Sequence, residues 1–372
     1  MTVILENGPD GQAVQFVTPR EVVAAWAPED VVPVLARLDA ARAAGMWVAG
    51  VIGYEAGLAL EPRLLAHAPW RQQGPLLAFG VYDGPEAPGD LPGAEGLRLT
   101  RAEPRVTRAV YGAAFDRVAG YIAAGDCYQV NLTFPMDARL SGGDALHLYA
   151  RLQARGAVRH GGIVDLGPGP AVVSRSPELF FTVDAAGAIR ARPMKGTAPR
   201  DPDPGRDRAL AVELFESIKA RAENLMIVDL LRNDIGRISQ VGSIRVPELY
   251  AVETFTTVHQ MSSTVTGRLS GAPGMAGLMA ALFPCGSVTG APKIRAMEII
   301  REVEPDPRGA YCGAMGWMAP DGRAAFAVTI RTLSVFPDGA VVLNVGGGVV
   351  ADSTAQGEWE EALWKARFAA PI

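Results

Sequence analysis

Three charged side chains near the end of the chain have the spacing of one helix face. A capping-box pattern at Ser353 predicts a helix over residues 354–368. On that helix Glu358, Glu361 and Lys365 form a single column. Such a column is most often a solvated surface with an ion pair worth about 0.3–0.5 kcal/mol. The preceding NVGGGVVADS favours a ligand site instead, because three glycines let a backbone approach a ligand closely.

A second helix is predicted over RAENLMIVDLLRNDIGR, and its centre is apolar all round, which is typical of a buried helix. Charges on a buried helix must be paired or bind an ion. Asp229, Arg232 and Asn233 have the composition of a purely structural network. Glu223, at the start of the apolar run, is therefore the better candidate for a ligand site.

Glu178 in SRSPELFF and Lys195 in RPMKGT are two further candidates. A lone Glu or Lys is usually exposed, and their spacing alone does not make a site. The loop FPCGSVTGAPK offers backbone N–H groups and a helix start to an anion, although a simple capped helix start explains much of this pattern. Its spacing is not that of a nucleotide-binding P-loop.

Strand-like runs such as AVVS and ELFFTV alternate with helix-like runs, which predicts an α+β or α/β fold with sizeable sheets. AFAVTIRTLSVF is predicted as one strand, and DRALAVELFESIKARAENLMIVDLLRNDIG as one helical run. ARPMKGTAPRDPDPGRDR is predicted as a loop because its prolines lack donors. Another helix is predicted near residues 29–44. The Gly- and Pro-rich segment 83–104 separates an N-terminal part, 1–105, from residues 106–372, which carry the candidate residues.

Composition excludes several classes of function. The net charge is −5, and 35 basic residues are scattered among 40 acidic ones, so we expect no nucleic-acid partner. No signal peptide and no run near 18 apolar residues is present, so we expect no membrane association and a cytoplasmic protein. Three cysteines and four histidines lack the spacing of disulfide frameworks or transition-metal sites.

Eight ordered motifs resemble those of the chorismate-utilising enzymes. They are YIAAGDCYQVNL, SRSPELFF, RPMKGTAPR, RAENLMIVDLLRNDIGR, FPCGSVTGAPKIRAMEII, RGAYCGAMGW, TIRTL, and VGGGVVADS followed by EWEEALWKA. The resemblance spans Tyr111 to Ala369, and GVIGYEAG fits the N-terminal part. It implies an α+β fold like that of anthranilate synthase component I, with two large, mostly antiparallel sheets packed as a sandwich and flanked by helices. Residues 1–105 would join the same large domain, and 106–372 would form the chorismate-binding core.

Two positions discriminate within this family. Members that use ammonia have glutamine at the position of Gln129, whereas members that add water have lysine. Anthranilate synthases read P-I-A-G-T where this chain has PMKGT, and aminodeoxychorismate synthases read P-I-K-G-T. The resemblance thus implies conversion of chorismate and ammonia to 4-amino-4-deoxychorismate, the precursor of 4-aminobenzoate and folate. An anthranilate synthase component I is the alternative, and a catalytically inactive regulatory member is a third possibility.

The resemblance also implies roles for individual residues. Lys195 would attack the ring as a neutral amine, which requires desolvation or nearby cations, and Glu178 would be the general acid/base. The implied substrate contacts are Gln129, Gly196, Thr197, Thr289, Tyr311, Arg331, Gly346, Gly348 and Lys365. Mg²⁺ would be held by Glu223 and Glu361, with Glu358 near the ion.

Two departures from the family pattern carry predictions. Gln260 replaces the histidine that assists pyruvate loss in anthranilate synthases, which predicts that pyruvate is retained unless the adjacent His259 substitutes. Ala220 lies where several relatives are acidic, which predicts fewer acidic groups around the metal ion than in those relatives. No glutaminase signature surrounds the cysteines, so we expect a glutamine amidotransferase subunit to deliver ammonia.

Overall fold

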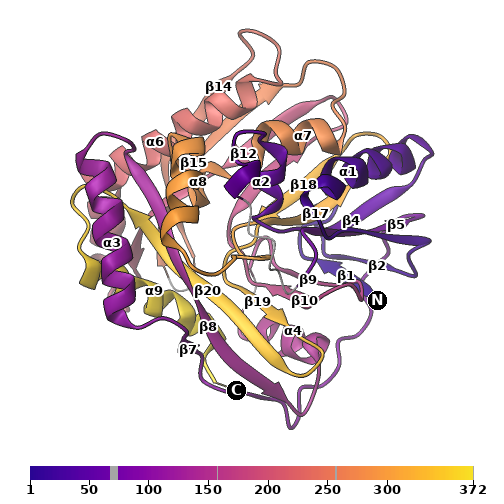
Figure 1. Cartoon of the computed structure of the whole chain (residues 1–372), viewed down its shortest axis with the longest axis horizontal. Coiled ribbons are helices and arrows are strands. Elements are labelled where there is room, and N and C mark those ends of the chain that lie inside the picture. The colour runs from indigo at the N-terminus through magenta and orange to yellow at the C-terminus, as the bar shows by residue number, and fades with distance from the viewer. Residues whose placement is uncertain (68–73, 157, 256–257, 372) are drawn as a thin grey trace.

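The computed structural model describes residues 1–67, 74–156, 158–255 and 258–371, and their strands form two ten-stranded antiparallel sheets. The first sheet has the order β16-β8-β20-β19-β10-β9-β1-β2, with β6 and β7 also paired to β8. The second has the order β13-β15-β12-β11-β18-β17-β4-β5-β3, with β14 also paired to β15. Figure 1 shows the long β8–β20 pair crossing the molecule beside the second sheet.

The strands of the first sheet are β1 (Thr2–Leu5), β2 (Val14–Val17), β6 (Arg98–Leu99), β7 (Glu103–Pro104), β8 (Gln129–Ser141), β9 (Gly162–Asp165), β10 (Ala171–Ser174), β16 (Gly290–Ala291), β19 (Thr332–Val335) and β20 (Ala340–Val349). Those of the second are β3 (Glu21–Ala25), β4 (Trp47–Ile52), β5 (Leu77–Tyr82), β11 (Leu179–Val183), β12 (Ala188–Arg192), β13 (Met194–Pro199), β14 (Arg245–Thr254), β15 (Val258–Arg268), β17 (Ala314–Met318) and β18 (Ala324–Val328). Residues before 105 therefore supply strands to both sheets, while the boundary at 105 stays a prediction.

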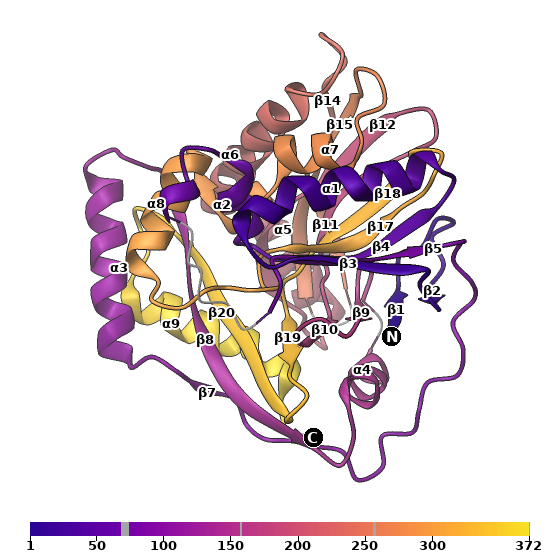
Figure 2. The same ribbon diagram turned by 45° about the vertical axis from the view of Figure 1, so that its right-hand side comes forward.

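The helices are α1 (Pro28–Ala43), α2 (Ala56–Leu60), α3 (Arg108–Ala123), α4 (Ala145–Gln153), α5 (Pro204–Glu216), α6 (Ile218–Gly236), α7 (Met275–Leu282), α8 (Lys293–Val303) and α9 (Ala355–Lys365), with 3-10 turns η1 (Leu65–His67), η2 (Gly286–Val288) and η3 (Ala366–Ala369). Helix α6 packs on β13 and β15, α1 on β3 and β4, α9 on β20, and α4 on β9 and β10. Figure 2 shows helices on the outside of both sheets. In the part of the chain that the structure describes, no helix is long and apolar enough to cross a membrane.

The two sheets face one another across an apolar layer. Val3, Phe16 and Val164 of the first sheet pack against Met315 and Trp317 of the second. A larger core lies between the sheets and the helices, where alternate residues of each strand point outward to meet the apolar helix faces. The predicted α+β sandwich is thus the observed architecture.

Three predicted elements are corrected by the structure. The first is the long helical run, which Ser217 divides into α5 and α6. The helix predicted near 29–44, by contrast, is present as α1. Ser217 has a non-helical ψ of 109°, and its hydroxyl accepts a hydrogen bond from Ala220 N at 3.2 Å. A serine N-cap inside a helix-favouring run gives a weak signal compared with proline or glycine.

The predicted loop over residues 191–208 contains strand β13. Pro193 precedes this strand and Pro199 is its last residue, so both prolines lie at its margins. The run AFAVTIRTLSVF is likewise not one strand, because β18 belongs to the second sheet and β19 to the first. Thr329, Ile330 and Arg331 carry the chain between the sheets, and Arg331 has a φ of +50°.

A second short connection runs beside this one, from β10 in the first sheet to β11 in the second. We call residues 175–178 and 329–331 the paired crossovers. Arg175 N donates to Arg331 O at 2.9 Å, and Val328 N donates to Glu178 O at 3.1 Å. Two residues that the sequence singles out therefore leave the sheets at one place.

Candidate functional site

A cavity of about 690 Å³ opens between the paired crossovers, β13, β20, α6 and α9. All but two of the predicted site residues line it: Glu178, Lys195, Gly196, Thr197, Glu223, Tyr311, Arg331, Gly346, Gly348, Glu358, Glu361 and Lys365. Its volume is in the usual range for small-molecule sites. The fold thus brings together residues that are far apart in the sequence.

Thr289 and Gln129 are the two predicted residues that do not line this cavity. The Thr289 hydroxyl donates to the carbonyls of Cys285 and Gly286, both at 3.2 Å, and so supports its own loop. Gln129 lies directly behind the wall, because a Cβ on Gly348 would stand 2.9 Å from Gln129 Cδ. Neither polar atom of the buried Gln129 carboxamide has a hydrogen-bond partner within the described ranges.

Glu178 lies on the first crossover and is buried. Burial raises the pKa of this carboxyl to about 7, although nearby Ser287 and Lys195 act to lower it. Its Oε1 has no hydrogen-bond partner among residues that the structure describes. Glu178 is thus a carboxyl group that can hold or release a proton near neutral pH.

Lys195 lies on β13 and faces the same cavity. The surrounding protein desolvates its ammonium and lowers the pKa of Lys195, against the raising influence of Glu178 and Glu223. Among the described residues, no hydrogen bond or ion pair within 4.0 Å holds its side-chain nitrogen. A lysine with a lowered pKa and no partner is suited to act as a nucleophile.

Helix α9 brings its charged column to the cavity. Lys365 Nζ lies 2.8 Å from Glu361 Oε1 and donates to Gly346 O at 2.9 Å. Glu358 Oε1 accepts a hydrogen bond from Ser353 Oγ at 2.7 Å. Burial raises the pKa of Glu358. At Glu361 burial also acts to raise the pKa, but Lys365, Lys195 and Lys219 together outweigh it, so the pKa of that carboxyl is lowered.

The cap of α9 differs from the prediction. Thr354, and not Ser353, is the N-cap, and its hydroxyl accepts from Gly357 N at 3.2 Å. Ser353 bonds to Glu358 instead, so the capping-box interpretation is wrong while the helix is confirmed. Gly347, the middle glycine of NVGGGVVADS, was not among the predicted contact residues, although a Cβ there would stand 2.6 Å from Glu358 Oε2. The glycines of β20 thus let the strand lie directly against the charged face of α9.

The cavity presents carboxylates from two helices, Glu223 from α6 and Glu358 and Glu361 from α9. Burial raises the pKa of Glu223, with Lys195 acting in the opposite direction. Over the described residues, no three acidic, histidine or cysteine side chains are close enough together to hold a metal ion unaided. This oxygen-only set fits a hydrated Mg²⁺, which often uses one or two carboxylates, waters and an anionic substrate.

The cavity lining also includes groups that suit an anion. Arg331 leaves the second crossover at the cavity, where burial lowers the pKa of its guanidinium against the influence of Glu178. Tyr311 also lines the cavity, and burial raises the pKa of its phenol well above the usual value. A guanidinium and a phenol that line one cavity can together bind a carboxylate.

The cavity lining also includes Gln260, Asn131, Ser287 and Lys219. Of these, the sequence drew attention to Gln260 and to the loop FPCGSVTGAPK that carries Ser287. His259 does not line it, because successive strand residues point to opposite faces. Its Nε2 lies 2.9 Å from Asp207 Oδ1, and its Nδ1 lies 3.0 Å from Thr254 Oγ1. His259 therefore does not take the place of the missing histidine.

The helix charges outside the cavity form ordinary pairs. Asp229 and Arg232 form an exposed ion pair at 2.7 Å, and Leu225 on the same helix is exposed, so the prediction of an all-round buried helix is wrong. Asp234 is buried and accepts a hydrogen bond from Lys293 Nζ at 2.5 Å. Ala220 lines the cavity wall and packs against Gly196.

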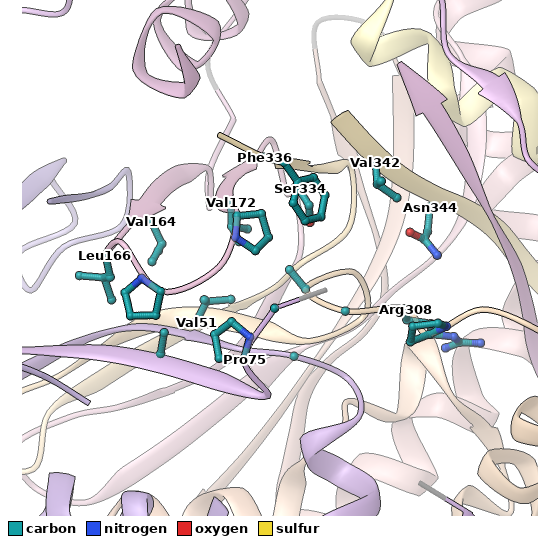
Figure 3. Close-up of a pocket in the computed structure, with 18 of the residues that line it drawn as sticks. Val51, Pro75, Val164, Leu166, Val172, Arg308, Ser334, Phe336, Val342 and Asn344 are labelled. Atoms are coloured by element: carbon teal, nitrogen blue, oxygen red, sulfur yellow. The ribbon is translucent and has the colours of Figure 1, made fainter. Parts of the chain in front are cut away.

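A smaller cavity of about 170 Å³ lies between the sheets (Figure 3). Apolar residues such as Val51, Val164 and Val172 line most of it, with Arg308 at one side. Asn344 lines both cavities. The predicted site residues are absent from the lining of the smaller cavity, as far as the described residues define it.

The chain is similar in sequence to proteins of known family. Residues 90–371 match the family described as chorismate binding enzyme. Aminodeoxychorismate synthase component 1 of Escherichia coli (strain K12) is 45% identical over 71% of this chain and 57% of its own length. Anthranilate synthase component 1 of Streptomyces coelicolor is 42% identical over 70% of this chain and 51% of its own.

The fold is similar to that of a solved structure, anthranilate synthase component I from Streptococcus pneumoniae. The two share 27% identity with a TM-score of 0.73, over 87% of this chain and 80% of that one. The matched region spans little more than half the length of each of the two relatives compared by sequence.

Proposed function

The chain belongs to the chorismate-binding enzyme family, and from this premise we propose that it aminates chorismate at C4 to give 4-amino-4-deoxychorismate. The observation that carries this proposal is Lys195, an amine with a lowered pKa that faces the cavity together with Glu178. An aminodeoxychorismate synthase and an anthranilate synthase are similar to this chain at 45% and 42% identity. Because these identities are close, our choice between the two activities depends on Lys195.

The chemistry proceeds in two displacements. The neutral Lys195 amine attacks C2, the two ring double bonds shift, and the C4 hydroxyl leaves as water with a proton from Glu178. Ammonia then attacks C4, the double bonds shift back, and the Lys195 amine leaves C2. Glu178 takes the proton that ammonia loses, so chorismate and ammonia give the amino product and one water.

The other cavity residues bind and orient the substrate. Arg331, Tyr311 and Lys365, with the backbone at Gly346 and Gly348, receive the enolpyruvyl carboxylate. Gly196 and Thr197 line the cavity and would lie beside the ring, and the buried carboxamide of Gln129 lies behind Gly348, where it would give this wall a polar group. Thr289 acts through its loop, since its hydroxyl is occupied there.

Glu223 and Glu361 would hold Mg²⁺, with Glu358 near the ion. The ion would supply a positive charge for the ring carboxylate and polarise the site. Glu361 would then serve both the ion and Lys365, because Glu361 and Lys365 form an ion pair at 2.8 Å.

The name of the Escherichia coli relative, component 1, supports a partner subunit. A glutamine amidotransferase would deliver ammonia to this chain. Glutamine should therefore replace ammonium salt as a nitrogen source only when that partner is added.

Product identity tests the proposal. The protein is incubated with chorismate, Mg²⁺ and ammonium chloride, and products are identified by mass spectrometry. We expect 4-amino-4-deoxychorismate, and Lys195→Ala should abolish it. Lys219→Ala is the matched control, because Lys219 is exposed at the cavity rim and pairs with Asp352 at 3.1 Å. This control should leave the product unchanged.

Anthranilate synthesis is the second candidate function, favoured by the Streptomyces coelicolor and Streptococcus pneumoniae relatives. In that reaction ammonia attacks C2 directly and pyruvate is lost, so no covalent lysine is needed. Fluorescent anthranilate as the main product would refute C4 amination. Without ammonia, our proposal also predicts a Lys195 adduct with the mass of chorismate less one water, whereas the alternative predicts none.

A further inference from the structure

The strand that carries Lys195 is irregular at that residue. Met194 pairs with Ser262, and Thr197 pairs with Gln260, so two residues of β13 lie opposite one residue of β15. Lys195 and Gly196 are therefore the two residues of a β-bulge that lie opposite the single residue Met261, and bulges redirect side chains at functional sites. Gly196 adopts a φ of +91°, which favours glycine.

The side chain of Gln260 closes this bulge. Its Nε2 donates to Gly196 O at 2.7 Å, and its Oε1 accepts from Thr197 Oγ1 at 2.9 Å. Both ends of one carboxamide are thus used on the two residues that follow Lys195. Gln260 is only 8% exposed, so water competes little for these bonds.

The other side of the bulge is closed by packing. A Cβ on Gly196 would stand 2.9 Å from Ala220 Cβ and 3.2 Å from Leu214 Cδ1. The bulge is therefore clamped between α5 and α6 on one side and the Gln260 carboxamide on the other. The Lys195 side chain itself has no comparable restraint from hydrogen bonds within the described segments.

We propose that Gln260 is a positioning residue, which fixes the direction in which Lys195 enters the cavity. This inference rests on the proposed function and names a determinant of it. A reaction can slow about 100-fold when its nucleophile is displaced by about 1 Å. The two hydrogen bonds of Gln260 beside Lys195 should therefore affect turnover more than substrate binding. A neutral carboxamide also adds no charge beside Lys195, whereas a carboxylate there would repel Gly196 O and raise the lysine pKa.

Gln260→Leu removes both hydrogen bonds at similar volume. With chorismate, Mg²⁺ and ammonium chloride, we expect kcat to fall about tenfold or more and KM for chorismate to change less than about threefold. Gln260→Glu keeps an acceptor for Thr197 but loses the donor to Gly196 above the pKa of the new carboxyl. Its activity should therefore decline as the pH rises over a range in which the parent is constant.

The matched control is Thr264→Val on the same strand. Thr264 is buried, and its hydroxyl donates to Glu248 Oε2 at 2.9 Å, away from the bulge. This variant should keep kcat within about twofold of the parent, as expected for a site remote from the chemistry.

A second readout does not depend on the reaction. Cyanate carbamoylates neutral amines, and peptide mass spectrometry reports the rate at Lys195, with Lys219 as the internal reference. We expect Gln260→Leu to slow labelling of Lys195 about threefold or more at pH 7.5 as its pKa rises toward the ordinary lysine value. If Gln260→Leu does not fold, the same measurements on Gln260→Glu decide the question.

The two ideas can fail separately. Parent protein that yields anthranilate refutes the proposed function, while the labelling comparison still tests the clamp. Parent-like kcat and parent-like Lys195 labelling in a folded Gln260 variant would overturn the positioning role.

Discussion

Burial of Glu178 lowers folding stability at neutral pH, but it also gives the carboxyl a pKa that suits proton transfer there. The folded protein retains a proton on this carboxyl up to pH of about 7, whereas an unfolded chain releases it near an ordinary Glu pKa. Folding stability should therefore fall as pH rises through this window and stay level above it. Glu55, whose pKa burial also raises to about 7, adds to the same trend.

Glu178→Gln removes this titration while keeping the shape of the side chain. We expect the free energy of unfolding at pH 8 to rise by about 1–3 kcal/mol, with little change at pH 4.5, and turnover to be lost. Urea denaturation at both pH values measures the difference. Glu103→Gln, at an exposed carboxylate, is the control, and equal stability of Glu178→Gln and parent at pH 8 would contradict the raised pKa.

Glu178 and Lys195 should titrate as a pair, since each shifts the pKa of the other. Protonated Glu178 with neutral Lys195 has the same number of protons as the ion pair, so the reactive state belongs to the singly protonated pair. We expect kcat/KM to be bell-shaped in pH, declining when the pair gains or loses a proton. Glu178→Gln should abolish one limb of any residual activity, and an unchanged bell would assign the limbs to other groups.

At the scale of elements, β20 and α9 approach one another through glycine. Gly347→Ala would place a Cβ 2.6 Å from Glu358 Oε2 and 3.4 Å from Lys365 Nζ, and both contacts are ends of flexible side chains. The protein should fold, but Glu358 must turn away from the strand. We expect Mg²⁺ affinity, measured by calorimetric titration, to fall about tenfold, the lower end of the loss seen when supporting groups of metal sites are altered.

Gly112→Ala is the control for this substitution. Gly112 lies within α3, and among the described residues beyond its own helix and neighbours no heavy atom would lie within 4 Å of the new Cβ. It should leave Mg²⁺ binding unchanged and slightly stabilise the helix. Equal Mg²⁺ affinity in Gly347→Ala and Gly112→Ala would argue against a role for Glu358 near the ion.

Sequence periodicity predicted those elements whose faces repeat over several turns. Helix α1 and the column of Glu358, Glu361 and Lys365 are present as expected. The bulge at Gly196 was not predictable because it depends on a contact with another element, Gln260 on β15. The break at Ser217 was missed for a different reason, because a serine N-cap inside a helix-favouring run is a weak local signal. The prediction of one strand across Thr329 was wrong because local β-propensity does not identify the sheet that a strand joins.

Most site residues were identified through motif resemblance, and their convergence on one cavity could not follow from spacing. Along the chain, the β11–β12 hairpin separates Glu178 from Lys195. Arg331 follows Glu178 only after the segment from β11 to β18, which contains most strands of the second sheet. Thr289 shows the limit of such transfer, because the hydroxyl that the motif suggested for ligand binding is used within its own loop.

At the scale of the molecule, one buried ion pair joins several segments behind the cavity. Arg308 donates to Glu304 at 2.7 and 2.8 Å, to Val288 O at 2.9 Å and to Asn131 O at 2.6 Å. Glu304 in turn accepts from Thr133 N at 2.7 Å. The pair therefore ties β8 to η2 and to the turn before Tyr311.

Glu304→Ala would leave the Arg308 guanidinium buried without its carboxylate. We expect it to lower the free energy of unfolding by about 3–5 kcal/mol, the usual cost of breaking a buried pair. Guanidinium chloride denaturation measures the loss. Glu213→Ala removes an exposed pair with Arg206 and should be indistinguishable from the parent. A Glu304 variant as stable as Glu213→Ala would mean that water reaches Arg308.

The paired crossovers have a consequence for motion between the sheets. Their mutual bonds, Arg175 N to Arg331 O and Val328 N to Glu178 O, lie where the chain passes from one sheet to the other. Separation of the sheets at this place requires both bonds to break. We therefore expect the amides of Arg175 and Val328 to exchange with deuterium in one cooperative opening. Their exchange rates should match each other, and should slow together when a ligand bridges Glu178 and Arg331.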